Sequence, residues 1–592
     1  MGATTIPARV FDNAKRYSNR PAYYVKRGGA WQPTTWAGYA DEVRRAGKAL
    51  MALGVGRGDT VGILGFNRPE WVIADVACMA IGGAPAGIYT TCSPPEVAYI
   101  ARHAEAPVVF VENRGQYDKV AARRDELPDL RWIVTFRDAE AIDDDQVLSW
   151  DEFLARGDAV DDAAFFAELD ALEPKGLATL IYTSGTTGPP KGVMLSHENL
   201  AWTADCLRTI NGGTPDDVGL SYLPLSHIAE QMMTIHGPAT TGSCVYYAES
   251  IDKVADNLRE VRPTAIFGVP RIWEKIHAGI AAKLDQATGV KAALVRWARG
   301  VGTRANALRM RGREPSGLLA LQYALANRLV FAKLKQAIGL DRGRSFVSGA
   351  APIGRDVLEF FASLDIVIQE VYGQSEDCGP TTLNLPGRTK LGTVGPPIPG
   401  VDVRIADDGE ILVRGPNVFL GYYKDPDATA EVLEDGWLHS GDLGALDADG
   451  FLTITGRKKD IIITSGGKNI APKNIEEAIK TCPLVSEAVV IGDQRKYLTA
   501  LVTLDEEAAR RFCDERGLNS VPLHEQPAIR AEIQSVVDAM NRDLAKVETI
   551  KKFAILPRNL TVDDGELTPT LKVKRRIVNK NWADVIESLY AE

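Results

Sequence analysis

Residues 182–192 read YTSGTTGPPKG and follow an apolar run, 177–182, that predicts a buried strand. Glycines let backbone N–H groups converge on an anion, while hydroxyls and a lysine add donors and charge. The spacing does not fit the P-loop pattern G-x-x-x-x-G-K-[ST], and a structural turn would need only one or two glycines. We therefore predict a polyphosphate-binding loop built from Thr183, Ser184, Gly185, Thr186, Thr187 and Lys191.

The sequence around this loop alternates short apolar strands with amphipathic helices over roughly the first 450 residues. This alternation is typical of a layered α/β protein. Near-continuous apolar strands are expected where helices cover both faces of a sheet. Strands are predicted over residues 59–65, 108–112, 264–269 and 366–372, and helices over 68–79 and 94–106.

The residue pattern changes at residues 456–460, which read GRKKD. This charged stretch between apolar segments is typical of an interdomain connection. The remainder mixes helical patterns with the strand patterns 488–491 and 498–504, which is enough for a small α+β domain. We predict an α/β fold with a large multi-lobed N-terminal domain, 1–457, and a small mobile α+β C-terminal domain, 458–592.

Composition excludes several classes of protein. The 592 residues are 45% hydrophobic and 25% charged, unlike disordered or collagenous chains. A net charge of −10 argues against nucleic acid as the main partner. Seven scattered cysteines, without CxxC or zinc spacing, indicate a reducing compartment. No signal-peptide pattern is visible, so we expect a cytoplasmic protein; the sequence leaves the oligomeric state open.

Residues 282–344 are strongly basic, because Lys and Arg outnumber Asp and Glu there by ten. We predict a helical insertion in the N-terminal domain. One interpretation is a solvated helical face. The other is a surface that docks on anionic lipid, which would make the protein peripheral at the membrane. Both interpretations remain open at this point.

Two further segments carry chemical groups. YGQSE, residues 372–376, follows an apolar strand, and catalytic groups favour strand ends in open α/β sheets. Glu376 suits Mg²⁺, which favours carboxylate and phosphate oxygen, and Tyr372 can stack on a base. In WLHSGDLG, residues 437–444, Asp442 can accept two hydrogen bonds from a ribose diol, although a turn-forming Asp is the plainer interpretation.

Four weaker features complete the set. SGAAP, residues 348–352, is a small-residue loop that leaves room for a flat base. Arg457 begins the interdomain stretch. Lys572 lies in LTPTLKVKR, where a lysine among basic residues is usually solvated. His227 lies in LPLSHIAE, and a packed or capping role would be the commoner explanation for it.

These segments, in this order, resemble the AMP-forming acyl-CoA synthetases of the adenylate-forming superfamily over essentially the whole chain. The superfamily also contains firefly luciferase and nonribosomal-peptide adenylation domains. LPLSHIAEQ and SGAAPIGRDVLEFF resemble long-chain and very-long-chain fatty acyl-CoA synthetases, the bubblegum-type branch in particular. The resemblance implies that ATP, with Mg²⁺, activates a fatty acid to acyl-AMP and pyrophosphate. CoA then takes the acyl group and AMP leaves.

The resemblance also assigns roles in nucleotide binding. The loop at 183–187 and Lys191 would hold the β- and γ-phosphates. Tyr372 would stack on adenine beside Gly349 and Ala350.

At the reacting atoms, Ser375 would touch the α-phosphate and Glu376 would bind Mg²⁺. Asp442 and Arg457 would hold the ribose. Lys572 would bridge the fatty carboxylate and the α-phosphate, stabilising the charge that develops during adenylation. These roles make Lys572 the central catalytic residue implied by the resemblance.

Other positions concern the second half-reaction and the acyl pocket. Lys459 matches the hinge about which the small domain rotates, and Gly466 belongs to a loop that would line the pantetheine tunnel. His227 would border the acyl pocket. Gln231 stands where some long-chain members carry a Trp gate, which puts gating of the tunnel in question. Lys468 stands where Glu is frequent.

Three alternatives remain. A fatty acyl-AMP ligase that donates to a carrier protein would use the same adenylation residues. A luciferase-like oxygenation of an adenylate is excluded by no single residue. A non-catalytic nucleotide-binding or membrane-surface protein belongs to another class, and the presence of Lys191, Glu376, Asp442 and Lys572 argues against it.

Overall fold

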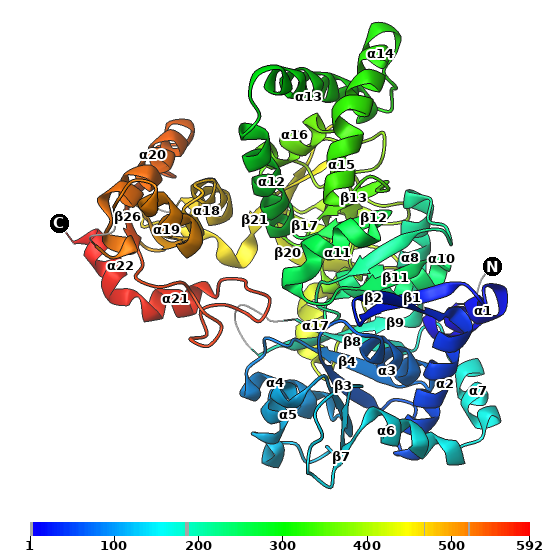
Figure 1. The fold of residues 1–592 in the computed structure, drawn as a ribbon. Coiled ribbons are helices and arrows are strands. Elements are labelled where there is room, and N and C mark those ends of the chain that lie inside the picture. The colour runs from blue at the N-terminus through cyan, green and yellow to red at the C-terminus, as the bar shows by residue number, and fades with distance from the viewer. Residues whose placement is uncertain (1–3, 184–188, 467, 519–520, 592) are drawn as a thin grey trace.

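The computed structural model describes residues 4–183, 189–466, 468–518 and 521–591. A large N-terminal part built of layered sheets and helices carries a smaller C-terminal part on one side (Figure 1). The apolar residues of the C-terminal part form cores of their own, which begin at Ile462. The predicted fold class, a large α/β domain with a small α+β domain, is therefore confirmed.

The largest sheet has the strand order β18-β9-β8-β4-β3-β5-β6-β7. Every residue of β3, β4 and β5 is buried, as expected of parallel strands with helices on both faces. The strands are β3 (Thr60–Leu64), β4 (Ala84–Ile88), β5 (Val108–Val111), β6 (Trp132–Thr135), β7 (Val147–Leu148), β8 (Leu177–Thr183), β9 (Lys191–Ser196) and β18 (Gly421–Tyr422).

Three smaller sheets complete the N-terminal part. Their orders are β10-β11-β1-β2, β12-β13-β14-β15 and β16-β17-β20-β19, with β21 paired to β20. The strands are β1 (Pro21–Arg27), β2 (Ala30–Thr35), β10 (Val218–Ser221), β11 (Cys244–Tyr247), β12 (Ala265–Gly268), β13 (Ser345–Ser348), β14 (Ile368–Tyr372), β15 (Thr382–Leu383), β16 (Asp402–Ile405), β17 (Glu410–Arg414), β19 (Leu433–Glu434), β20 (Trp437–Leu446) and β21 (Leu452–Arg457).

Helices cover these sheets, and several of them begin at a capping side chain. Helix α4 begins after Ser93, whose backbone N–H and hydroxyl both donate to the Glu96 carboxylate. The helices are α1 (Ile6–Arg16), α2 (Trp36–Ala52), α3 (Pro69–Ala80), α4 (Pro94–Ala104), α5 (Arg114–Ala121), α6 (Trp150–Arg156), α7 (Asp162–Asp170), α8 (His197–Asn211), α9 (Ile228–Gln231), α10 (Gly237–Thr241), α11 (Val254–Val261), α16 (Arg355–Ser363) and α17 (Pro426–Val432).

The basic stretch 282–344 is helical, as predicted. It contains the end of α12 (Pro270–Asp285), then α13 (Gly289–Arg309), α14 (Gly317–Ala326), a π-helical turn at Asn327–Phe331, and α15 (Ala332–Ile338). In Figure 1, α13 and α14 lie at one extremity of the molecule.

The C-terminal part packs helices on the sheet β24-β25-β26. Its elements are β22 (Ile462–Ile463), β23 (Asn469–Ile470), α18 (Pro472–Lys480), β24 (Val485–Ile491), β25 (Leu498–Leu504), α19 (Glu506–Asp514), α20 (Pro527–Asp543), β26 (Ile550–Ile555), α21 (Arg575–Asn581) and α22 (Ala583–Tyr590). Among the described helices, none combines the length and the apolar composition that a membrane span requires.

Candidate active site

A continuous cleft of about 2810 Å³ opens between the N-terminal and C-terminal parts and runs into the N-terminal part. The predicted site residues that line it are Thr183, Lys191, His227, Ala350, Tyr372, Ser375, Glu376, Asp442, Arg457, Lys459 and Lys572. The predicted residues Ser184, Gly185, Thr186 and Thr187 lie outside the described residues. The fold thus gathers most of the predicted positions in one cleft.

The ends of β13 and β14 form one wall of the cleft. A Cβ at Gly373, after β14, would overlap the carbonyl oxygen of Gly379, so only glycine fits there. A Cβ at Gly349, after β13, would press on Val371. Gly349 therefore packs against β14 instead of lining the cleft, while the next residue, Ala350, lines it with a φ of +68°. This contact brings the two predicted segments together.

Asp442 lies between two donors. The Tyr372 hydroxyl donates to its Oδ2 at 2.9 Å, and Arg457 Nε lies 3.3 Å from its Oδ1. Residues 442 and 457 are direct partners in the β20–β21 pairing. Burial raises the pKa of Asp442, and the Arg457 charge and the Tyr372 hydroxyl oppose that rise. Each carboxylate oxygen can accept more than one hydrogen bond, so acceptor capacity remains for a diol.

Tyr422 connects two predicted groups. Its hydroxyl donates to Glu376 Oε1 at 2.8 Å, and Lys191 Nζ lies 4.6 Å from the centroid of its ring. Tyr422 lies on β18, which pairs with β9. No sequence pattern indicated Tyr422, because only the β18–β9 pairing brings it beside Glu376 and Lys191. Ser375, next to Glu376, is buried and also lines the cleft.

Lys572 reaches the cleft on a loop of the C-terminal part that docks on the N-terminal part. The Thr91 hydroxyl donates to the carbonyl of Pro569 at 2.7 Å, and Lys574 Nζ lies 3.9 Å from Glu96 Oε1. Solvent reaches Lys572. Even so, desolvation by the surrounding protein lowers its pKa, and the nearby Arg457 charge lowers it further. The loop therefore presents an ammonium group to the cleft.

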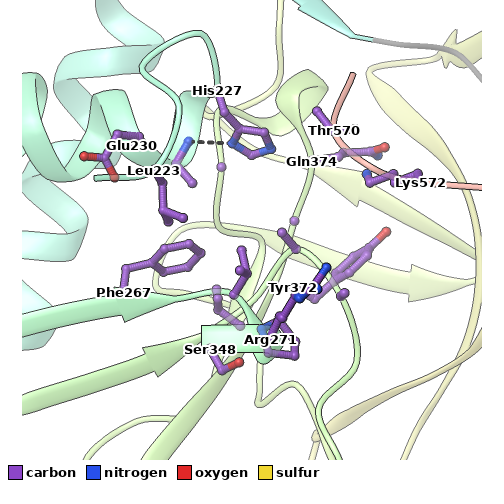
Figure 2. A pocket seen from close by; sticks show the side chains of 18 of the residues that line it. Leu223, His227, Glu230, Phe267, Arg271, Ser348, Tyr372, Gln374, Thr570 and Lys572 are labelled. Atoms are coloured by element: carbon purple, nitrogen blue, oxygen red, sulfur yellow. Dashed lines mark hydrogen bonds between the residues drawn. The ribbon is translucent and has the colours of Figure 1, made fainter. Parts of the chain in front are cut away.

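His227 both caps a helix and lines the cleft, two positions that the sequence analysis treated as alternatives. It caps α9, because the Ala229 backbone N–H donates to its Nδ1 at 3.1 Å. It also lines the cleft, where Figure 2 shows it above the space that Lys572 and Tyr372 border. Burial and then the Lys572 charge lower its pKa to about 4. The ring is therefore neutral at pH 7, with its proton on Nε2 because Nδ1 accepts.

Apolar side chains line the part of the cleft that lies inside the N-terminal part, and we call this part the apolar tunnel. Its wall includes Leu207, Val218, Met232, Met233, Pro238, Val245, Ile266 and Phe267. Gln231, in contrast, is fully buried and does not line the tunnel. Position 231 therefore cannot gate the tunnel in this structure, and the neighbouring methionines are the flexible side chains at that point.

Sequence reasoning also missed Glu230, a carboxylate in the tunnel wall. Its Oε1 accepts hydrogen bonds from the hydroxyls of Ser221 at 2.7 Å and Thr234 at 2.8 Å. Burial raises its pKa to about 7, and these donors oppose the rise. The carboxylate lies in the quoted segment LPLSHIAEQ, but nothing in the sequence indicated that it would be buried.

Two predicted residues of the C-terminal part, Lys459 and Gly466, lie away from the centre of the cleft. Lys459 is exposed in a short 3₁₀ turn, Lys458–Asp460, at the edge of the cleft. Gly466 is exposed in the turn between β22 and β23 and does not line the cleft. The arrangement brings Lys572 to the other site residues and leaves Gly466 apart from them.

Tyr372, Asp442 and Arg457 on one wall of the cleft, with Lys572 from the C-terminal part, form an adenylate-forming type of site. The chain belongs to the AMP-binding enzyme family. A profile described as "AMP-binding enzyme" matches residues 10–423, and one described as "AMP-binding enzyme C-terminal domain" matches residues 459–592.

Curated relatives and a solved structure agree with this assignment. The chain is 39% identical to long-chain-fatty-acid–CoA ligase ACSBG2 of Xenopus laevis, over 99% of this chain and 84% of the relative. It is 38% identical to long-chain-fatty-acid–CoA ligase FadD15 of Mycobacterium bovis, over 99% and 97%. ATP-bound MatB from Rhodopseudomonas palustris is 25% identical, with a TM-score of 0.71 over 98% of this chain and 99% of that one.

Proposed function

We propose that the protein is a long-chain fatty acid–CoA ligase. A fatty carboxylate attacks the α-phosphorus of ATP, the bond to the β-phosphate breaks, and acyl-AMP and pyrophosphate form. The CoA thiol then attacks the acyl carbon, and AMP leaves. AMP is a far better leaving group than oxide, which is why the acid is activated first. The names of the relatives support the acyl class, and the apolar tunnel supports a long chain.

In the proposed complex, adenine stacks on Tyr372 beside Ala350, and Gly349 supports the loop from behind. The ribose diol binds Asp442 and Arg457. Support for this comes from the hydrogen bond and ion pair that orient the Asp442 carboxylate before any nucleotide binds. The phosphates bind the loop 183–187 and Lys191, and Ser375 contacts the α-phosphate.

Lys572 stabilises the charge that develops on the α-phosphate oxygens and the fatty carboxylate during attack. The Nε2–H of His227 donates to the same carboxylate and orients it at the mouth of the tunnel. The neutral state of His227 suits this role, because an imidazolium would place a second positive charge beside that of Lys572.

Glu376 fits a Mg²⁺ ion. Its Oε1 accepts the Tyr422 hydroxyl, so Oε2 remains as a ligand. A single carboxylate suits Mg²⁺, which binds mostly through substrate phosphates and water. The bound ion would neutralise phosphate charge. Tyr422 holds the carboxylate in place and keeps it close to Lys191.

We propose that the boundary between the two domains lies between residues 457 and 458. For the thioester-forming step, we propose that Lys459 acts as the hinge between them. Rotation about it would withdraw Lys572 and bring the Gly466 turn to the cleft, where it would line the path of CoA. The position of Gly466 outside the cleft in this arrangement supports a need for such a movement. We also propose a cytoplasmic location, which the free cysteines among the described residues support.

The observation that carries the proposal is the docking of the Lys572 loop beside Asp442 and Glu376 at the mouth of an apolar tunnel. The test incubates the enzyme with ATP, Mg²⁺, CoA and saturated fatty acids from short to very long. We expect CoA-dependent formation of AMP and acyl-CoA with a preference for long chains. Acyl-AMP that accumulates but transfers only to a carrier protein would contradict CoA as acceptor.

A further inference from the structure

Helix α14 presents an apolar stripe to solvent. Its sequence, GLLALQYALA, contains no charged residue. Leu318 and Leu321 are each 71% exposed, Leu325 is 50% exposed, and Leu329 in the following turn is 37% exposed. Residues spaced by three and four positions lie on one face of a helix. Single exposed leucines are ordinary on protein surfaces, but four on one face indicate a binding surface.

The opposite face of α14 accounts for the folding of the insertion. Ala326 is fully buried, and Leu319 and Tyr323 pack against a cluster that includes Ala298 and Val301 of α13. The outer leucines are therefore not needed for this packing. A folding role does not explain them, since the helix is already held by its inner face.

Basic side chains lie on α14's neighbouring segments, before, beside and after the apolar stripe. On the segments next to the stripe, Arg304, Arg311, Arg313, Arg328 and Lys333 are exposed and form no ion pair with a described residue. Glu314 is the only acidic residue between positions 289 and 340, and it pairs with Arg309. The local positive charge contrasts with the net charge of −10 for the chain. This local positive charge therefore favours an anionic partner for the surface.

We propose that the outer face of α14, with its basic rim, docks on the surface of an anionic lipid bilayer. The leucines enter the interfacial region, and the rim binds lipid headgroups. Figure 1 shows α14 at an extremity of the molecule, away from the C-terminal part, so a flat partner can reach it. A second copy of this chain fits the same surface poorly, because a symmetric contact would place two basic rims against each other.

The test measures sedimentation with vesicles of phosphatidylcholine containing phosphatidylglycerol, and with vesicles of phosphatidylcholine alone. We expect binding to the anionic vesicles, weakened by added salt. Leu321→Ser should lower the partition coefficient about tenfold, as expected for one leucine leaving an apolar phase. Val547→Ser, at a half-exposed valine of the C-terminal part, is the matched control and should change nothing.

The contribution of charge is tested with the double variant Arg311→Gln and Arg313→Gln. Because each basic residue near an anionic surface contributes about 1 kcal/mol, vesicle binding should fall about tenfold or more. The control pair is Arg510→Gln with Arg511→Gln, whose side chains already pair with glutamates. Circular dichroism and the thermal unfolding temperature serve as the folding check for every variant.

Three results would overturn this inference. One is equal vesicle binding by Leu321→Ser and the unchanged protein. Another is binding to neutral and anionic vesicles with the same salt response. The third is an unchanged protein that binds no vesicles but forms a dimer by light scattering, with that dimer lost in Leu321→Ser. None of these bears on adenylation, so this inference and the proposed function fail separately.

Discussion

Replacing Lys572 by alanine tests the proposed chemistry most sharply. The residue is held in its loop by two hydrogen bonds, from the Thr568 backbone N–H to its carbonyl and from its own N–H to the Thr568 hydroxyl. The backbone should keep this position in Lys572→Ala, so the change removes mainly the ammonium group. Loss of one donor to a charge that develops in the transition state typically costs about 100- to 1000-fold in rate.

We therefore expect adenylation by Lys572→Ala to fall at least about 100-fold. Pyrophosphate release measures this half-reaction, and conversion of synthetic acyl-AMP to acyl-CoA measures the other, which should survive. Arg576→Ala, which removes an exposed positive charge four residues away, is the control and should leave both rates unchanged. Equal losses in the two half-reactions of Lys572→Ala would refute the role given to the ammonium group.

Four further predictions follow from the same site. Tyr372→Phe removes the hydrogen bond to Asp442 and should raise the KM for ATP about tenfold, the cost of a hydrogen bond to a charged group; an unchanged KM would separate the pair from ribose binding. Glu376→Gln should raise the Mg²⁺ concentration needed for half-maximal rate, and an unchanged requirement would remove it as a ligand. Thr91→Val should slow adenylation about threefold or more by weakening loop docking, whereas slower thioester formation from acyl-AMP would contradict that reason. Because the pKa of Lys572 is lowered, its ammonium group should lose its proton, and the adenylation rate should decline, at a pH below the ordinary pKa of lysine. In Lys572→Arg this decline should move to higher pH, and a decline that stays at the same pH would assign it to another group.

Much of the fold and of the site could be predicted from the sequence, because local pattern determined it. The strand predicted at 498–504 matches β25, and the helix predicted at 94–106 matches α4 to within two residues. The segments that we assign to nucleotide binding could be recognised for a similar reason. Strand ends that carry glycines and polar groups are distinctive, and the structure brings Tyr372 and Asp442 into direct contact.

The residues that the sequence did not reveal depend on long-range pairing. Tyr422 approaches Glu376 only because β18 adds to β9 at the edge of the large sheet. Thr91 contacts Pro569 of the Lys572 loop, which lies 478 residues further along the chain. The positive charge of the basic insertion could be counted, but the outward direction of Leu321 could not, since an apolar helical stripe normally faces a core.

The most direct measurement separates the nucleotides formed when the purified enzyme consumes ATP with Mg²⁺ and a long-chain fatty acid. Cleavage between the α- and β-phosphates is the central claim, and it predicts one AMP and one pyrophosphate for each acyl-CoA formed once CoA is added. Formation of ADP and inorganic phosphate, or ATP that stays intact in the presence of every fatty acid, would contradict it.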